Sequence, residues 1–414
     1  MKVFILERHS LPLINIVTAV NVGSKDEDEL TNGFTHLLEH LILFRGTEKK
    51  SGEEIGWEMR KHGAYFNGHT GKDVTTFEIS LPSEHLDFAL EIHKEMLFNL
   101  KITEDNLFKE KKVVMEEINS YLDDPGEYAK ILMFEQLFKD HPYSFPPTGK
   151  KEVIEKATVE EIYSFYRNYF TPNNCALTIV GDIDIEEVSQ KIREIFEPLP
   201  KNQIPQRELI SSKPLEKTVK STLQMDVTQA YLVIGMLGPA FNHPDQFAVD
   251  VLLKIIGSGF NHRLWRTLKG RRNLVHSISM NYVSYKYSGA IIITATLPSK
   301  HLTTVIREIR KILKEARTSR YSKEEYVHAP GYLYASDEIE SAKNQIRVDH
   351  YSAQEIGLNL ARGIAQFLIL SEGKFKEGYL SQIKNVTSSN LRKVTGKYLY
   401  KDRYSIVTII PKSK

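Results

Sequence analysis

Cysteine is almost absent from this sequence, with Cys175 the only one among 414 residues. A single thiol cannot form an internal disulfide, and it cannot supply a cysteine-rich metal site or a Cys-x-x-Cys redox pair. Disulfides are rare in reducing compartments, which fits this composition. We therefore predict a cytoplasmic protein.

Long apolar runs and an excess of one charge are also missing. No window of about 20 apolar residues occurs, and charged residues interrupt the apolar patch in residues 1–23, so we expect neither a membrane span nor a signal peptide. The 55 basic and 53 acidic residues leave a net charge of +2. Such a weak overall field gives no support for nucleic acid or membrane partners, and the basic run at 269–272 is interpreted as a solvated face.

What remains is the composition of an ordinary globular protein, with 41% hydrophobic and 26% charged residues. A chain of 414 residues is long for one hydrophobic core. The stretch around 198–218 has scattered prolines and charges with little periodicity, which is typical of a linker. We predict an N-terminal domain at 1–205, a linker at 206–220 and a C-terminal domain at 221–414.

The two halves repeat one order of apolar patterns. Alternation predicts strands, and helical periodicity predicts helices. In the first half, strands are predicted at 14–22, 74–81 and 176–184, helices from about 33 and at 83–98, 103–122 and 159–170, and a turn and loop at 63–73. In the second half, strands are predicted at 229–237, 290–297 and 404–410, and helices at 247–256 and 301–316. We predict an α+β fold of two homologous domains of about 200 residues from an internal duplication, each a mainly antiparallel sheet with helices packed on one face.

The stretch FTHLLEHLILF at 34–44 places two histidines and a glutamate in an apolar run. On a helix, His36 and His40 share one face, and Glu39 can reach what lies between them. Two neutral imidazoles and a carboxylate bind Zn²⁺ and leave a position for water, whose pKa the metal lowers. Glu39 then takes the proton of the water and passes it to the leaving amine. This order, His-x-x-Glu-His, is the inverted form of a zinc peptidase motif, although the spacing alone also occurs by chance.

A third protein ligand is expected on the predicted helix 103–122. If Leu107 occupies position a of a heptad, Glu110 and Glu117 share the inward position d, whereas Glu116 faces water. The alternative, in which Glu110 and Glu117 are solvated and only flank the apolar stripe, stays open on this pattern.

The sequence resembles the pitrilysin family of zinc peptidases, which includes insulysin and the mitochondrial processing peptidase, over nearly the whole chain. The resemblance is carried by the motif and by stretches such as FRGTEKK, GAYFNGHTGKDVTTF, EEINSYLDDP and SGFNHRLWRTLKGRRNLVHSI. It implies one zinc ion per chain, with Glu117, 77 residues after His40, as third ligand and Glu110 as a supporting residue. It also implies that Asn67 lies by the active site, on or beside an edge strand to which peptide substrates add, and that His69 is a loop residue.

The second half departs from the family pattern. Active members have an arginine and a tyrosine seven residues apart that hold the substrate, and Lys269 and His276 stand at the matching positions. Lysine lacks the planar fork of arginine, and histidine lacks the phenol. Short family members pair two chains around a chamber, so the resemblance implies a dimer, and this departure favours a heterodimer with a homologous chain that carries the Arg/Tyr pair.

Three functions follow from these observations. The first is a zinc metalloendopeptidase that acts on peptides or unfolded polypeptide segments. The second is a catalytically weak or inactive subunit with a structural role in an assembly. The third is a structural zinc site, although a glutamate beside an open coordination position is unusual for that role.

Overall fold

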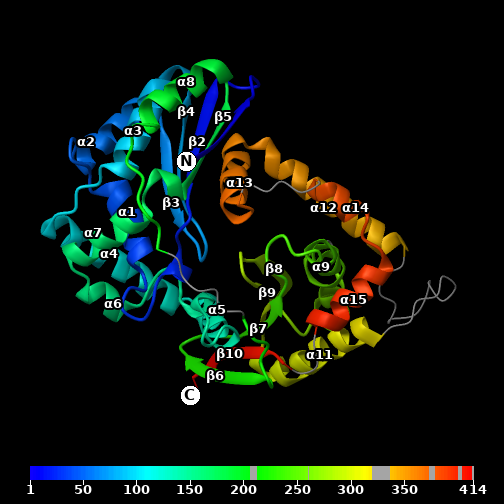
Figure 1. The fold of residues 1–414 in the computed structure, drawn as a ribbon. Helices are drawn as coiled ribbons and strands as arrows, with labels where there is room; N and C mark the ends of the chain where they lie inside the picture. Colours follow the sequence, from blue (N-terminus) through cyan, green and yellow to red (C-terminus); the bar gives the residue numbers. More distant parts are fainter. Residues whose placement is uncertain (206–211, 260, 319–335, 373–377, 400–402, 413–414) are drawn as a thin grey trace. The chain divides into compact units, whose positions relative to one another are not determined.

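The computed structural model describes residues 1–205, 212–259, 261–318, 336–372, 378–399 and 403–412 (Figure 1). The chain forms two compact units. The first contains residues 1–120, 145–208 and 352–375, and the second contains residues 121–144, 209–351 and 376–414. Each unit therefore combines segments from both halves of the sequence. The boundaries at 205 and 221 stay a prediction, and residues 206–211 of the predicted linker lie outside the described residues.

The first unit contains a five-stranded sheet with the strand order β1-β5-β2-β4-β3. Its strands are β1 (Lys2–Glu7), β2 (Leu13–Val20), β3 (Tyr65–Thr70), β4 (Thr75–Pro82) and β5 (Cys175–Gly181). Only β1 and β5 pair in parallel, and all other neighbours are antiparallel. Strand β3 lies at one edge of this sheet, so among the described strands only β4 pairs with it, on one side of its backbone.

Seven helices of the first unit contribute to the main core together with one face of the sheet. They are α1 (Phe34–Phe44), α2 (Gly52–Lys61), α3 (Leu86–Phe98), α4 (Glu104–Asp123), α6 (Lys151–Lys156), α7 (Val159–Tyr169) and α8 (Ile185–Phe196). Strand β2 shows why both faces must be covered, because Ile14 and Ile16 belong to this core while Val17 and Ala19 point to the other face. The other face is covered by α13 (Gly357–Leu370) (Figure 1). The sheet therefore has helices on both faces, whereas helices were predicted on one face.

Helix α13 packs against the first sheet through small residues. Ala361 and Ala365 are fully buried against β2 and β5, which allows a close approach of the helix to the sheet. Arg362 binds Glu78 of β4 in a bidentate pair, with both N–O distances at 2.8 Å. Since Glu78 is buried, this fork fixes the helix on the sheet as well as neutralising the carboxylate.

The second unit repeats the first sheet with the order β6-β10-β7-β9-β8. Its strands are β6 (Val219–Met225), β7 (Ala230–Gly238), β8 (Ser277–Ser284), β9 (Gly289–Leu297) and β10 (Ser405–Pro411). The first and last strands again form the one parallel pair. Identical strand order supports the internal duplication and confirms the α+β fold of two mainly antiparallel sheets.

The second unit resembles the first in its helices as well as in its sheet. They are α5 (Pro125–Leu137), α9 (Gln246–Leu253), α10 (Arg263–Trp265), α11 (Leu302–Thr318), α12 (Ser336–Glu355, whose last residues belong to the first unit), α14 (Tyr379–Lys384) and α15 (Ser388–Tyr398). Helix α5 packs Ala129 and Met133 against Val233 of β7 and Val407 of β10 (Figure 1). A helix from the first half thus covers the second sheet, while α13 from the second half covers the first.

Most predicted elements overlap those observed, and one prediction is wrong. Residues 65–70, predicted as part of a turn and loop, form the edge strand β3. Glycine and asparagine are depleted in strands, so Asn67 and Gly68 concealed the alternation. The elements that were not predicted are strands β1, β6 and β8 and helices α2, α5, α6, α8, α10, α12, α13, α14 and α15.

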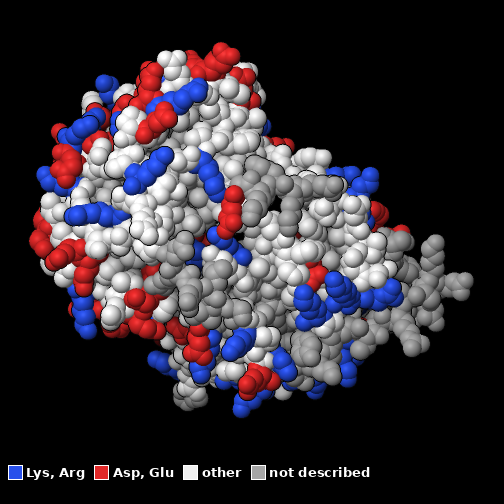
Figure 2. All heavy atoms as spheres, in the orientation of Figure 1, with Lys and Arg blue, Asp and Glu red and all other residues white. Residues whose placement is uncertain are grey.

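The surface of the described residues carries no dominant charge in the view of Figure 2. Acidic and basic side chains are interspersed over the first unit (Figure 2), in keeping with the net charge of +2. Among the described residues, no helix combines the length and the apolar character that a membrane span requires.

Candidate metal centre

Helix α1 begins beside a buried carboxylate. The Glu27 oxygens accept hydrogen bonds from the backbone N–H groups of Gly33 and Thr35, each at 2.8 Å, where the first turn of a helix lacks backbone acceptors. Gly33 adopts φ 106°, a left-handed conformation that favours glycine. Burial raises the pKa of Glu27 to about 7, against the effect of its hydrogen bonds. The helix that carries the histidines therefore has a fixed start.

Three predicted ligands converge between α1 and α4. The ligating atoms of His36, His40 and Glu117 all lie within 4.8 Å of one another. The two rings meet edge to face with centroids 4.7 Å apart. Glu117 Oε2 lies 3.3 Å from His40 Nε2 and 3.7 Å from His36 Nε2. On α4, Glu116 is exposed, so the structure places the two inward carboxylates as the heptad pattern predicted.

The outer ring nitrogens of both histidines have protein partners. Nδ1 of His40 lies 3.0 Å from Oε1 of Glu110, whose other oxygen accepts a hydrogen bond from Arg45. Nδ1 of His36 lies 3.4 Å from the carbonyl oxygen of Thr148. Such partners orient an imidazole and leave Nε2 free to coordinate a metal. The sequence identified Glu110. It assigned no role to Arg45, although Arg45 lies in the family-like stretch FRGTEKK, or to Thr148, because both residues meet the site through tertiary packing.

The geometry of this donor set fits zinc. Ligand bonds of 2.0–2.2 Å in a tetrahedral site place two ligand atoms roughly 3.3 to 3.6 Å apart. The observed separations from Glu117 Oε2, 3.3 and 3.7 Å, are close to that value. Two imidazoles and one carboxylate are the protein ligands of many catalytic zinc sites, which keep a fourth position open.

The pKa values in the group show how it favours a cation. Burial and the neighbouring His40 lower the pKa of His36 to about 4, so this ring is neutral and able to coordinate. Burial acts in the same direction on His40, but contacts with Glu110 and Glu117 outweigh it and raise the pKa to about 9. Contact with His40 in turn lowers the pKa of Glu117. Burial opposes ionisation of Glu110, yet His40 and Arg45 lower its pKa as well. Both carboxylates are thus held in the charged form, and a metal that binds His40 displaces the proton that its raised pKa retains.

Glu39 lies beside the three donors and turns toward the edge strand. Its Oε2 accepts a hydrogen bond of 2.5 Å from Thr70 Oγ1 on β3. Only 7% of Glu39 is exposed. Burial raises its pKa to about 6, and the bond from Thr70 acts against that rise. A carboxyl group with a pKa near neutrality can both accept and return a proton. Thr70 was not identified from the sequence, because it lay in the stretch predicted as a loop.

The structure places Asn67 on the edge strand, as the resemblance implied. Its side chain donates to the Tyr65 hydroxyl at 3.2 Å, on the face of β3 opposite to Gly68 and Thr70. The side chain of Asn67 therefore points away from Glu39, and only its backbone lies near this part of the site. His69 was predicted to be a loop residue rather than a ligand. It belongs to the same strand, so the loop assignment was wrong, and it is not among the three converging donors.

Lys269 and His276 are neighbours in the second unit. Lys269 belongs to the turn of π-helix Arg266–Gly270, and His276 immediately precedes β8. The Lys269 ammonium donates a hydrogen bond to the carbonyl oxygen of His276. Their role in binding substrate stays a prediction.

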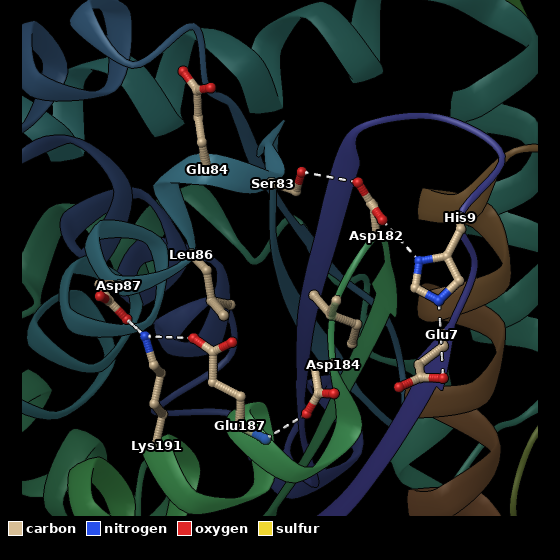
Figure 3. Close-up of a pocket in the computed structure, with 11 residues that line it drawn as sticks. Glu7, His9, Ser83, Glu84, Leu86, Asp87, Asp182, Asp184, Glu187 and Lys191 are labelled. Carbon is tan, nitrogen blue, oxygen red and sulfur yellow. Dashed lines mark hydrogen bonds and ion pairs between the residues drawn. The ribbon is translucent and has the colours of Figure 1, made fainter.

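A separate cavity of about 670 Å³ in the first unit is lined by carboxylates (Figure 3). Its two basic side chains are already paired, His9 with Asp182 at 2.7 Å and Lys191 with Glu187 at 2.9 Å and with Asp87. Ser83 also binds Asp182, at 3.3 Å, and does not bind His9 (Figure 3). None of the metal donors lines this cavity, and its side chains form no catalytic triad.

Two family models match most of the chain. The model described as "Insulinase (Peptidase family M16)" matches residues 3–146, and the model described as "Peptidase M16 inactive domain" matches residues 156–329. The chain belongs to peptidase family M16. The resemblance to the pitrilysin family drawn from the His-x-x-Glu-His motif and its flanking stretches is therefore confirmed.

Relatives match this M16 chain over nearly its whole length. It is 24% identical to "Uncharacterized zinc protease YmxG" of Bacillus subtilis, over 95% of this chain and 91% of that protein. It is 26% identical to "Zinc protease PqqE" of Helicobacter pylori, over 96% of this chain and 87% of that protein. Relatives of this M16 chain thus include proteins named as zinc proteases.

Solved structures share the fold. A protease from Helicobacter pylori has a TM-score of 0.87 and 23% identity, covering 98% of this M16 chain and 97% of its own. A peptidase M16 inactive domain from Pseudomonas fluorescens has a TM-score of 0.87 and 18% identity, covering 99% and 96%. At these identities the likeness concerns the two-unit fold alone.

Proposed function

We propose that this M16 chain is a zinc-dependent metalloendopeptidase that hydrolyses peptides or unfolded polypeptide segments. The convergence of His36, His40 and Glu117, with Glu39 beside them, is the observation that carries the proposal. Names of relatives as zinc proteases support the same reaction class. One zinc ion is held per chain by these three ligands.

The residues of the site have distinct tasks in peptide hydrolysis. A bound zinc ion supplies Lewis-acid activation of water and of the scissile carbonyl. Glu39 accepts a proton from the attacking water and then delivers it to the leaving amine. Glu110 fixes the ring of His40 through Nδ1, which keeps Nε2 directed at the ligand position. Burial of these groups excludes bulk water and strengthens their interactions.

The edge strand β3 offers a site for the substrate. A peptide that adds to an exposed sheet edge is recognised by its backbone, while side chains set only a secondary preference. Glu39 contacts the same strand. A peptide on this edge therefore brings its own main chain, which carries the scissile bond, toward the base. The expected substrates are extended or unfolded segments of varied sequence.

We further propose that the working enzyme is a pair of chains around a chamber, with a homologous partner that supplies an Arg/Tyr pair. Lys269 keeps a positive charge at the arginine position, but it has no planar fork, and its ammonium is bonded to His276. The cytoplasmic location proposed from the single cysteine is compatible with a partner made in the same compartment.

The proposal is tested by measuring zinc content and hydrolysis of a quenched peptide mixture. Glu39→Gln removes the proton acceptor and preserves the ligands, so we expect full zinc content with a loss of kcat of about 100-fold or more. His40→Ala should lose both zinc and hydrolysis. Retained hydrolysis by Glu39→Gln would show that this mechanism is wrong.

A further inference from the structure

The edge strand β3 holds the carboxylate of Glu39 from one side. Thr70 Oγ1 donates to Glu39 Oε2 at 2.5 Å. Both residues are buried, with 8% of Thr70 and 7% of Glu39 exposed. The bond joins a strand to a helix across 31 positions of the sequence, so it depends on how closely β3 approaches α1.

Gly68 lies against the same carboxylate. It is two positions before Thr70 and therefore faces the same side of the strand. A Cβ atom at Gly68 would lie 2.7 Å from Glu39 Cγ and 2.9 Å from Oε1. Real Cβ contacts are not that short, so glycine here provides space for Glu39. No left-handed φ at this position requires glycine.

These two contacts distinguish the oxygens of Glu39. The terminal torsion of a glutamate is broad, so an unheld carboxylate rotates and exchanges its oxygens. Thr70 occupies Oε2. The backbone of Thr70 also forms a hydrogen bond to this carboxylate. Oε1 is the oxygen that a Cβ atom at Gly68 would approach to 2.9 Å, so it lies beside the main chain of β3.

We propose that Thr70 is a positioning residue that holds Glu39 Oε2 and presents Oε1 as the proton acceptor, in space provided by Gly68. The inference rests on the proposed role of Glu39 as base. It means that the strand which receives the substrate also orients the group that activates water. Thr70 itself contacts neither zinc nor substrate.

The test replaces Thr70 by valine, which keeps the branched shape and removes the hydroxyl. Thr76→Val is the matched control, because Thr76 is a buried threonine on the adjacent strand β4 whose hydroxyl has no hydrogen-bond partner among the described residues. Misplacement of a catalytic group costs on the order of 10- to 100-fold, so we expect that loss in kcat for Thr70→Val. KM should change less than about twofold, since ground-state binding is not affected. Zinc content should stay at one per chain, Thr76→Val should behave as the wild type, and Thr70→Ser should restore kcat.

Two further measurements separate this inference from the proposed function. Crystal structures of the zinc-free proteins should show Glu39 rotated in Thr70→Val and unrotated in Thr76→Val, whether or not the wild type is a peptidase. Should Thr70→Val fail to fold, Gly68→Ala provides a second variant, with the same expected loss in kcat because its methyl group displaces Glu39. Unchanged kcat in an active enzyme carrying Thr70→Val or Gly68→Ala would overturn the inference. A wild type that binds no zinc, or that stays inactive when paired with a homologous chain carrying the Arg/Tyr pair, would overturn the proposed function alone.

Discussion

At the scale of single residues, both histidines and Glu39 each have a neighbouring group that binds the atom facing away from the metal position. Glu110 orients His40, Thr148 bonds to His36, and Thr70 holds Glu39. Preorganisation of this kind lets a site act without rearrangement, because its ligands and base already have the required orientation. The neighbours should therefore matter almost as much as the groups they hold.

Glu110→Gln tests this expectation for the metal ligands. The amide keeps the shape of the side chain but loses the charge that supports His40 Nδ1 and balances Arg45. Loss of such a partner typically weakens metal binding by 10- to 100-fold, so we expect the zinc dissociation constant to rise by about that factor. Competition with a chelator measures it. Glu116→Gln, on the exposed side of the same helix, should bind zinc as the wild type does; equal affinity in both variants would contradict the role of Glu110.

Sequence patterns were informative about the site wherever spacing along one helix determines which side chains lie together. His36 and His40 are four positions apart on α1, and the heptad phase of α4 selected Glu117 over Glu116. Sequence patterns did not predict contacts between different helices and strands. Thr70 meets Glu39 only because β3 is a strand beside α1, and Asn67 and Gly68 concealed that strand. Thr148 lies in a loop with no periodicity, so no local pattern reports it.

At the scale of elements, the two sheets show how a duplicated chain covers four apolar faces. Strong alternation predicted the central strands β2, β4, β7 and β9. It did not predict α5 and α13, because their buried faces match a sheet from the other half of the chain. The apolar period of a helix reports that it is buried and not which sheet it covers.

Two substitutions on α13 test how this helix packs. Ala365 is fully buried against the sheet, and overpacking of a tight core typically costs 1–3 kcal/mol, so Ala365→Leu should lower the free energy of unfolding by about that amount. Gly363 lies on the same helix, and a Cβ atom added there would meet no neighbouring atom within 4 Å. Gly363→Ala should raise the free energy of unfolding by roughly 0.5–1 kcal/mol, since alanine favours helices over glycine. Denaturant unfolding measures both, and a neutral Ala365→Leu would be inconsistent with the close approach of α13.

At the scale of the whole molecule, the sequence has a complete set of metal donors but lacks the Arg/Tyr pair that holds the substrate in active family members, here called the clamp. A purely structural subunit needs no proton acceptor beside its metal ligands, but Glu39 lies beside these three ligands. Lys269 and His276, in contrast, depart from the pattern of active family members. This asymmetry is what a pair of unlike chains predicts, with the metal on one and the clamp on the other.

We expect the isolated chain to bind zinc but to hydrolyse peptides weakly. Addition of a homologous chain that carries the Arg/Tyr pair should raise kcat/KM on the order of 100-fold, the effect of restoring a transition-state donor. The same addition to Glu39→Gln should give no gain, which assigns the chemistry to this chain. Ordinary peptidase rates from the isolated chain would rule out an obligatory partner. Substoichiometric zinc after metal-replete purification would instead favour the assembly role.

Because α13 comes from the second half of the chain, the first sheet is synthesised long before the helix that covers its second face. The last strand of the first sheet ends at Gly181, and the helix that covers its second face ends at Leu370, 189 residues later. At translation rates of 5–20 residues per second, this interval lasts about 10 to 40 seconds. Throughout that time α13, the described helix that covers the apolar face with Val17 and Val180, has not been completed, so we expect this face to need other cover, such as a chaperone, until α13 has been made.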